Sequence, residues 1–367
     1  MGDVIKVQAG SLVGSLSVAV LPVRERQTRR IPALGAVRLA ADSDGLCVSA
    51  TSFDATITTW LEAEAEGEAA VPLERLADLA QHFPTDAEIV IACNDNGATV
   101  TSGKARFKLP VFPLPDLPER HILGEETGRV ELDAKAVREL FSRPAFAAST
   151  EASRFYLNGI FLHSVGDDLV AVATDGYRLC RIKAAAATPL SRDRSLIIAN
   201  EVTRTISRLL ASASGNVTLR RSERLFSVES AGFALVTKRI DATYPSYEQL
   251  ISFEAPNVVT TSRTRLQESL ARFAAVADPQ AKTHIVKLRW NADGLQLSTP
   301  DGSADSLAAD FEGEARTAAQ VCHLVELLAA LRGDSVRLSV AEPNSAILIT
   351  DPDDEKFTAI QMPVRSP

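Results

Sequence analysis

The sequence has 367 residues, of which 46% are apolar, 23% are charged and 5% are aromatic, and its formal net charge is −8. A chain of this length is too long for one ordinary hydrophobic core, so two or three domains are expected. It contains no run of eighteen apolar residues and no basic and apolar leader. These features argue against a membrane-spanning or secreted protein and predict a cytoplasmic globular one.

The charge is unevenly distributed along the chain. Residues 1–127 carry 11 Lys and Arg against 18 Asp and Glu, residues 128–253 carry 17 against 13, and residues 254–367 carry 11 against 16. The middle third is therefore basic, while the two outer thirds are acidic. A protein with an acidic exterior around a basic interior surface has charge totals of this kind. Many proteins that never bind nucleic acid have them too.

Apolar residues recur at helical spacing in two segments of each third. The first segments are residues 10–23, 133–149 and 262–277, and the second are residues 72–83, 200–212 and 317–331. Alternating segments follow each helix, and several of them are joined by Asp-Gly or Asn-Gly turns, which are typical of β-hairpins. The strands expected on this basis are residues 37–41, 46–50, 88–92, 216–220, 285–290, 295–298 and 335–340.

Each third closes on an extended segment that contains proline, at residues 107–118, 233–247 and 357–363. The chain thus repeats one unit, helix–strands–helix–strands, three times, which indicates a gene triplication. The short turns favour antiparallel sheets with helices on one face. We predict an α+β fold of three tandem domains, at residues 1–127, 128–253 and 254–367.

The stretch 171–180, Ala-Val-Ala-Thr-Asp-Gly-Tyr-Arg-Leu-Cys, lies near the middle of the chain. Alternating apolar residues lead up to Thr174, Asp175-Gly176 offers a tight turn, and a second strand leaves through Tyr177. One interpretation is a simple hairpin. The other is a partly apolar pocket, because a hydroxyl, an aromatic ring, a guanidinium and an aliphatic group surround one bend.

Basic residues share helix faces opposite the apolar stripes. The pairs are Lys135 with Arg138, Arg204 with Arg208, and Arg265 with Arg272, whereas Glu74 and Asp78 nearly cancel Arg75. A loop with four arginines, Arg24, Arg26, Arg29 and Arg30, follows the first helix. Charge on a solvated helix face or loop is ordinary. Because the pattern recurs on several helices, a second interpretation is a helix-lined surface for nucleic acid. Such a surface would contact phosphates without reading bases.

Motifs for catalysis, cofactors or metals are missing from the sequence. There is no Gly-x-Gly-x-x-Gly, Walker, Gly-x-Ser-x-Gly or His-Glu-x-x-His motif, and the five histidines are scattered. The acidic run 351–355 lacks the glycine and the spacing of a calcium loop. The four cysteines lie far apart, which favours reduced thiols over disulfides. We therefore predict no enzyme activity, no metal and no cofactor.

The motif at residues 173–179 and four further motifs, which follow in the right order along the chain, resemble those of the bacterial sliding clamp family, the β subunit of DNA polymerase III. Residues 173–179 resemble its Ala-Thr-Asp-Gly-His-Arg-Leu, residues 155–159 its Tyr-Tyr-Leu-Asn-Gly, residues 244–247 its Phe-Pro-Asp-Tyr, and residues 361–365 its Val-Met-Pro-Met-Arg. Residues 31–35 also correspond to its Leu-Pro-Ile-Leu-Gly. The resemblance covers the whole chain and the threefold repeat.

The resemblance implies a head-to-tail homodimer that closes into a ring of six domains, with helices lining a hole for duplex DNA and sheets outside. It implies a pocket for short motifs of the Gln-x-x-Leu-Phe type, shared by DNA polymerase, the clamp loader and repair proteins. The residues implied for this pocket are Leu157, Thr174, Gly176, Tyr177, Arg178, Leu179, Pro245, Gln249, Leu250, Ile360, Met362, Pro363, Val364 and Arg365.

On the DNA side, the arginine loop and the segment of Arg154 and Tyr156 correspond to regions that contact the duplex in relatives. The DNA-binding residues expected from helix faces and resemblance together are Arg24, Arg26, Arg29, Arg30, Arg75, Lys135, Arg138, Arg154, Tyr156, Arg204, Arg208, Arg265 and Arg272. Binding of this kind does not depend on DNA sequence.

The chain departs from the family pattern at several positions. Tyr177 stands in place of histidine, Gln249 of arginine and Gln361 of an apolar residue, and the chain ends Arg-Ser-Pro. A clamp that confers processivity on a polymerase is the leading hypothesis. The alternatives are a clamp-fold peptide-binding scaffold, a second clamp with fewer partners that does not act in bulk replication, and an enzyme that uses Asp175, Tyr177 and Arg178.

Overall fold

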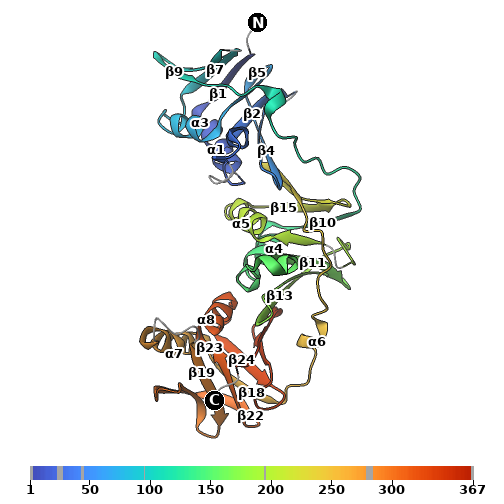
Figure 1. The fold of residues 1–367 in the computed structure, drawn as a ribbon, viewed down its shortest axis with the longest axis vertical. Coiled ribbons are helices and arrows are strands. Elements are labelled where there is room, and N and C mark those ends of the chain that lie inside the picture. Colours follow the sequence, from blue (N-terminus) through green and yellow to red (C-terminus); the bar gives the residue numbers. More distant parts are fainter. Residues whose placement is uncertain are drawn as a thin grey trace. The chain divides into compact units, whose positions relative to one another are not determined.

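The computed structural model describes residues 3–22, 28–42, 45–94, 96–193, 196–277 and 284–364. The chain forms two compact units (Figure 1). Unit 1 comprises Met1–Lys135 and Arg204–Arg239, and unit 2 comprises Ala136–Thr203 and Ile240–Pro367. Every strand pairing found among the described residues is antiparallel, which confirms the predicted α+β class with antiparallel sheets.

Unit 1 contains two sheets. The five-stranded sheet has the order β5 (Glu64–Glu66), β1 (Asp3–Gln8), β7 (Glu88–Asn94), β8 (Gly97–Ser102), β9 (Ala105–Leu109). The eight-stranded sheet has the order β10 (Gly128–Asp133), β15 (Asn216–Arg221), β16 (Leu225–Ser230), β17 (Phe233–Lys238), β4 (Ala55–Leu61), β3 (Gly45–Thr51), β2 (Ala36–Asp42), β6 (Glu68–Pro72). Because β17 pairs with β4, strands from the first and middle thirds share this sheet.

Unit 2 also contains two sheets. The nine-stranded sheet has the order β14 (Ile197–Ala199), β11 (Gly159–Val165), β12 (Asp168–Thr174), β13 (Arg178–Ala185), β26 (Asp354–Gln361), β25 (Ile347–Asp351), β24 (Ser335–Val340), β18 (Asn257–Ser262), β22 (Ala309–Glu312). The four-stranded sheet has the order β21 (Ala304–Leu307), β20 (Gly294–Ser298), β19 (Ile285–Asn291), β23 (Ala315–Gln320). Pairing of β13 with β26 joins the middle and last thirds.

The helices pack their apolar stripes onto these sheets. In unit 1, α1 (Ala9–Ala19) contacts α3 (Leu73–Ala80) as well as β3 and β4. In unit 2, α7 (Arg263–Val276) lies beside α8 (Val321–Ala330), and the two contact β24 and β26 (Figure 1). The remaining helices are α4 (Ala134–Ser142), α5 (Asn200–Leu209) and the short α6 (Glu248–Ile251), with 3₁₀ turns at Pro32–Gly35, Leu114–Asp116, Ala145–Ala147 and Ala152–Leu157.

Several helix boundaries differ from the sequence prediction. The helix predicted over residues 133–149 ends at Ser142, because proline at position 144 disfavours helical geometry in the residue before it. The helix predicted over residues 317–331 begins only at Val321, since Ala315–Gln320 forms β23 and pairs with β19. The segments predicted to begin at residues 10, 72 and 200 are helical over shorter spans.

Candidate functional site

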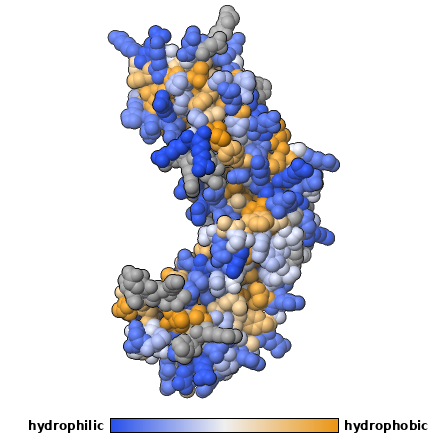
Figure 2. Space-filling view, viewed as in Figure 1, coloured by the Kyte–Doolittle hydropathy of each residue, from blue (hydrophilic) through white to orange (hydrophobic). Residues whose placement is uncertain are grey.

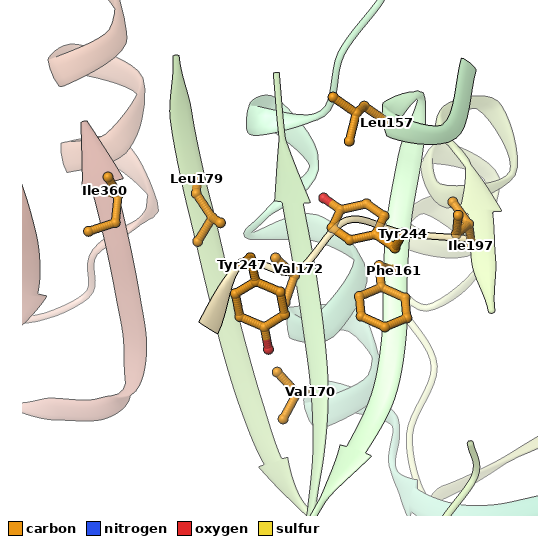
Figure 3. Close-up of a cluster of buried hydrophobic side chains, with 9 residues drawn as sticks. All are labelled: Leu157, Phe161, Val170, Val172, Leu179, Ile197, Tyr244, Tyr247 and Ile360. Carbon is orange, nitrogen blue, oxygen red and sulfur yellow. The ribbon is translucent and has the colours of Figure 1, made fainter. Parts of the chain in front are cut away.

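One face of the nine-stranded sheet carries a continuous apolar band across neighbouring strands. Phe161 lies opposite both Val172 and Ile197 in register, and Leu179 lies opposite Ile360. Directly opposed residues of antiparallel strands point to the same face of the sheet. These side chains therefore form one buried cluster, together with Leu157, Val170, Tyr244 and Tyr247 (Figure 3).

Aromatic residues from the segment before α6 cover this band. The Tyr244 ring stacks on Phe161 with centroids 4.7 Å apart, and the His163 ring also stacks on Phe161, with centroids 4.6 Å apart. His163 Nε2 and the Tyr247 hydroxyl are 2.7 Å apart, within hydrogen-bond distance. Burial raises the pKa of the Tyr244 phenol, so this side chain remains neutral.

Partly buried side chains surround the cluster and form its rim. They are Tyr156, Ile240, Ala242, Ile251, Phe253, Ala346, Leu348 and Met362. Leu348 lies opposite Ile360 in register, so the apolar band continues onto β25. A rim of half-buried aliphatic and aromatic groups with one methionine is the kind of surface that accepts apolar side chains of a ligand.

The turn between β12 and β13 is the predicted Asp175-Gly176 bend. Thr174 lies opposite Leu179, and the Thr174 hydroxyl accepts from the Gly176 N–H at 3.1 Å and donates to the Arg178 carbonyl at 2.6 Å. An Asp175 carboxylate oxygen accepts from the Tyr177 N–H at 2.9 Å. These local bonds hold the bend, and Tyr177 within it is 54% exposed.

Replacing Gly176 by alanine is expected to destabilise this turn. Gly176 has φ +90°, and an added Cβ would lie 3.0 Å from Nη1 of Arg154. We expect the free energy of unfolding to fall by about 1–2 kcal/mol, measured by urea denaturation. Gly232→Ala is the control, since Gly232 has no left-handed φ and faces open space. Equal effects of both substitutions would contradict the proposed strain.

Arg178, implied for the pocket, has its guanidinium bonded within the protein. Its Nε donates to Asp175 at 3.1 Å, Nη2 donates to the Phe146 carbonyl at 2.9 Å, and Nη1 pairs with Glu326 on α8. The guanidinium also lies over the Phe146 ring, and the side chain is only 10% exposed. Arg178 therefore holds the turn against α8, with little left to offer a ligand.

The end of β26 completes the site. The Met362 N–H donates to the Tyr177 carbonyl at 2.8 Å, and the Val364 N–H donates to the Ala318 carbonyl at 2.8 Å. Gln361 is 1% exposed, and its amide donates to the Met362 carbonyl at 2.8 Å. Leu250 is 45% exposed. Of the other implied residues, Pro363 is half-buried, Pro245 and Gln249 are exposed, and Arg365 lies outside the described residues.

His323, one of the five scattered histidines, also lies at this site, on α8. Its ring centroid lies 6.5 Å from that of Tyr177. Burial and the nearby Arg178 lower the pKa of His323, so its imidazole is neutral near pH 7. The spacing of His323 and Glu326 on α8 gives no signal of a site in the sequence. Their place beside the Asp175-Gly176 turn depends on the pairing of β13 with β26, which brings α8 to that turn.

The predicted basic helix faces are exposed. On α5, Arg204 and Arg208 point away from buried Val202, Ile206 and Leu209. Lys135 and Arg138 on α4 and Arg75 on α3 are likewise exposed. Hydrophilic residues cover most of the visible face of each unit, with smaller apolar patches between them (Figure 2). These exposed cations are available to phosphates.

Other residues expected at DNA are engaged within the protein. Arg154 donates to the Asp175 carbonyl at 3.1 Å and pairs with Glu151 at 3.2 Å. Arg265 pairs with Glu268, and Arg272 pairs with Asp305 at 2.6 Å, which lowers the pKa of that aspartate. Tyr156 packs against the apolar cluster. Arg29 and Arg30 are exposed, whereas Arg24 and Arg26 lie outside the described residues.

Within the part of the chain that the structure describes, no group of three or more His, Cys, Asp or Glu residues is arranged to hold a metal ion. None of the helices formed by those residues combines the length and the apolar character needed to span a bilayer.

Cys93 and Cys180 are buried, and burial raises the pKa of their thiols to about 11 and about 12. Such thiols are poor nucleophiles.

Comparison with known proteins covers almost the whole chain. Family models for the N-terminal, central and C-terminal domains of the DNA polymerase III beta subunit match residues 4–121, 131–246 and 248–365. The beta sliding clamp of Pseudomonas putida is 26% identical, with 98% of this chain and 99% of that protein covered.

Solved structures give the same result. The DNA polymerase III subunit beta of Pseudomonas aeruginosa has a TM-score of 0.91 at 25% identity, covering 99% of this chain and 100% of that one. The sliding clamp of Bartonella birtlesii bound to griselimycin has a TM-score of 0.90 at 26% identity, covering 100% of both chains. The chain belongs to the DNA polymerase III beta subunit family, the sliding clamps.

Proposed function

We propose that this chain encircles duplex DNA as a head-to-tail homodimer and tethers DNA polymerase, the clamp loader and repair proteins through short linear motifs. It confers processivity and catalyses no reaction itself. We propose that its three domains divide at residues 127 and 253, and that it acts in the cytoplasm. Family membership supports this proposal. The observation that supports the binding of short linear motifs is the apolar band that crosses β13 and β26.

We propose that the motif-binding pocket lies over this band. Leu179 and Ile360 form its floor, while Tyr177, Met362 and Leu250 form its exposed or half-exposed wall. Leu and Phe anchors of a bound motif would bury apolar area against the wall, and such anchors supply most of the affinity of short peptides. Arg178 serves as a positioning residue, since its guanidinium is used in fixing the turn.

We propose that the DNA-facing surface consists of the exposed basic residues of the helices. Lys135 and Arg138 on α4, and Arg204 and Arg208 on α5, supply the middle-domain part of it. Arg265 and Arg272 are only partly neutralised by their surface ion pairs and supply a further part, because exposed pairs are weak and screened by salt. Such contacts bind phosphates without regard to DNA sequence.

The proposed dimer joins sheet edges. β9 is an edge strand of unit 1 with exposed Arg106, Phe107 and Lys108, and β21 is an edge strand of unit 2 that carries Asp305. Pairing of the β9 edge of one protomer with the β21 edge of the next is heterologous, so two copies can close into a ring. Closure also covers edges that otherwise favour aggregation.

The proposed ring is tested by its retention on DNA. Light scattering is expected to give a mass of twice 39.3 kDa. After loading onto nicked circular duplex by a bacterial clamp loader and ATP, the protein should stay with the DNA through gel filtration and leave it once a restriction enzyme linearises the circle. Equal retention on circular and linear DNA would instead support a peptide-binding scaffold that does not encircle DNA.

A further inference from the structure

A buried arginine of the middle third binds two elements of the last third. Arg143, which directly follows α4, is only 7% exposed although its side chain is charged. Its Nη1 donates to a carboxylate oxygen of Asp354 at 2.7 Å, and its Nε donates to the Ala330 carbonyl at 2.9 Å. Asp354 is the first residue of β26 and Ala330 is the last residue of α8. One side chain therefore holds the start of β26 and the end of α8.

Arg143 also contacts both strands of the β13–β26 pair. Its guanidinium lies over the Phe357 ring of β26, 5.2 Å from the ring centroid. Its carbonyl accepts a weak hydrogen bond from the Cys180 thiol of β13, with the two atoms 3.9 Å apart. In register, Cys180 lies opposite Ala359 and Ile182 lies opposite Phe357. Arg143 thus touches the two strands at the place where they pair.

The floor of the proposed pocket lies on the other face of the same two strands. Successive residues of a strand point to opposite faces of the sheet, so Leu179 faces away from Cys180. Leu179 lies opposite Ile360, just as Cys180 lies opposite Ala359. The contacts of Arg143 therefore support the pair of strands from the face opposite to that of the pocket.

A buried arginine of this kind contributes more to geometry than to stability. Moving a carboxylate and a guanidinium out of water is costly, and their mutual attraction roughly offsets this cost. Nη2 of Arg143 is buried and has no hydrogen-bond partner among the described residues, so its loss of hydration is not compensated. The planar guanidinium nevertheless requires its acceptors in fixed directions, which constrains both Asp354 and the Ala330 carbonyl.

We infer that Arg143 is a second positioning residue for the motif-binding pocket. It fixes β26 against β13 from below and so sets the spacing of Leu179 and Ile360 in the floor. This inference rests on the proposed function, in which these two residues accept the apolar anchors of a bound motif. Arg143 itself touches no ligand. Without it, the two strands can shift slightly while they remain paired, and a binding site loses affinity when its supporting residues no longer hold it in place.

The test separates positioning from stability by removing both charges together. Arg143→Met with Asp354→Asn keeps an apolar side chain over Phe357 and an oxygen for the Lys356 N–H, which now donates to Asp354. Glu139, 3.9 Å from Arg143, keeps its ion pair with Arg332. The melting temperature should change by no more than about 3 °C, because apolar replacement of a buried ion pair is often close to neutral.

Peptide affinity should nevertheless fall in this variant. We expect the Kd of a Gln-x-x-Leu-Phe-type peptide, measured by fluorescence anisotropy, to rise about tenfold. Arg220→Met with Glu126→Gln is the matched control, since it removes the same charges from an ion pair of unit 1. This control should bind the peptide like the unaltered chain.

Arg143→Lys provides a second, conservative variant that decides the question if the double variant does not fold. Lysine keeps the charge beside Asp354, but its single ammonium lacks the planar fork that bonds Asp354 and the Ala330 carbonyl together. Its Kd should rise about threefold, between those of the unaltered chain and the double variant.

The possible results distinguish this inference from the proposed function. If the unaltered chain does not bind the peptide, the proposed pocket itself is refuted, and the role of Arg143 with it. If the unaltered chain binds and the Arg143 variants bind equally well, only the positioning role is overturned. An equal loss of affinity in the Arg220 control would overturn it too. So would a loss of affinity that occurs only together with a fall in melting temperature of more than about 10 °C, because that result indicates general damage to the fold.

Discussion

Met362→Ala combined with Leu250→Ala is expected to weaken binding of a Gln-x-x-Leu-Phe-type peptide at least about 100-fold. Truncating two apolar wall residues removes contacts that are buried only when the peptide is bound, and such hot-spot truncations cost about 2–4 kcal/mol. Met362 is half-buried and Leu250 is 45% exposed, so the fold should tolerate both changes. Fluorescence anisotropy with a labelled peptide measures the decrease in affinity.

The choice of residues matters for this experiment. Leu179 is 1% exposed, and its truncation to alanine would cost about 2–5 kcal/mol of stability, so weaker binding would not be separable from damage to the core. Val165→Ala with Val276→Ala is the matched control, because these side chains are 52% and 65% exposed and lie outside the proposed pocket. Light scattering should show the same mass for all variants. Unchanged peptide affinity in the Met362 and Leu250 variant would show that the pocket is misplaced.

Arg204→Glu combined with Arg208→Glu is expected to weaken association with duplex DNA by one to two orders of magnitude at low salt. The two exposed arginines lie four residues apart on α5, on the face opposite its buried side chains. Removing one phosphate-binding cation lowers the slope of log affinity against log salt by about 0.9, so the slope should fall by roughly 2. Titration of a short duplex at several salt concentrations gives both quantities.

A matched charge change separates local contact from net charge. Lys104→Glu with Lys356→Glu also replaces two exposed cations, but in hairpin segments away from the basic helix faces. This control should leave the salt slope nearly unchanged. A second duplex of different base sequence should bind with the same affinity. A strong sequence preference, or an equally large decrease in affinity in the control, would refute phosphate binding through α5.

Local features of the fold followed from the sequence with good accuracy. The bend at Asp175-Gly176 was predictable because glycine readily adopts the positive φ that the turn requires, and alternation in the flanking residues marks the strands. On α5, the spacing of Val202, Ile206 and Leu209 separates a buried stripe from the basic face. Helix ends were less predictable, since Thr317 joins β23 through pairing with Leu288, a residue distant in the chain.

The sequence by itself determined the threefold repeat, the α+β class, the hairpin at Gly176 and the basic faces of the helices, because each depends on residues close together in the chain. Only the tertiary structure decided which strands complete each sheet. Pairing of Leu179 with Ile360 brings the middle and last thirds together, and this places His323 beside Tyr177. Tyr156 packs partly buried against the apolar cluster that contains Leu179 and Ile360. Such contacts depend on long-range strand pairing, which side-chain periodicity along one strand does not specify.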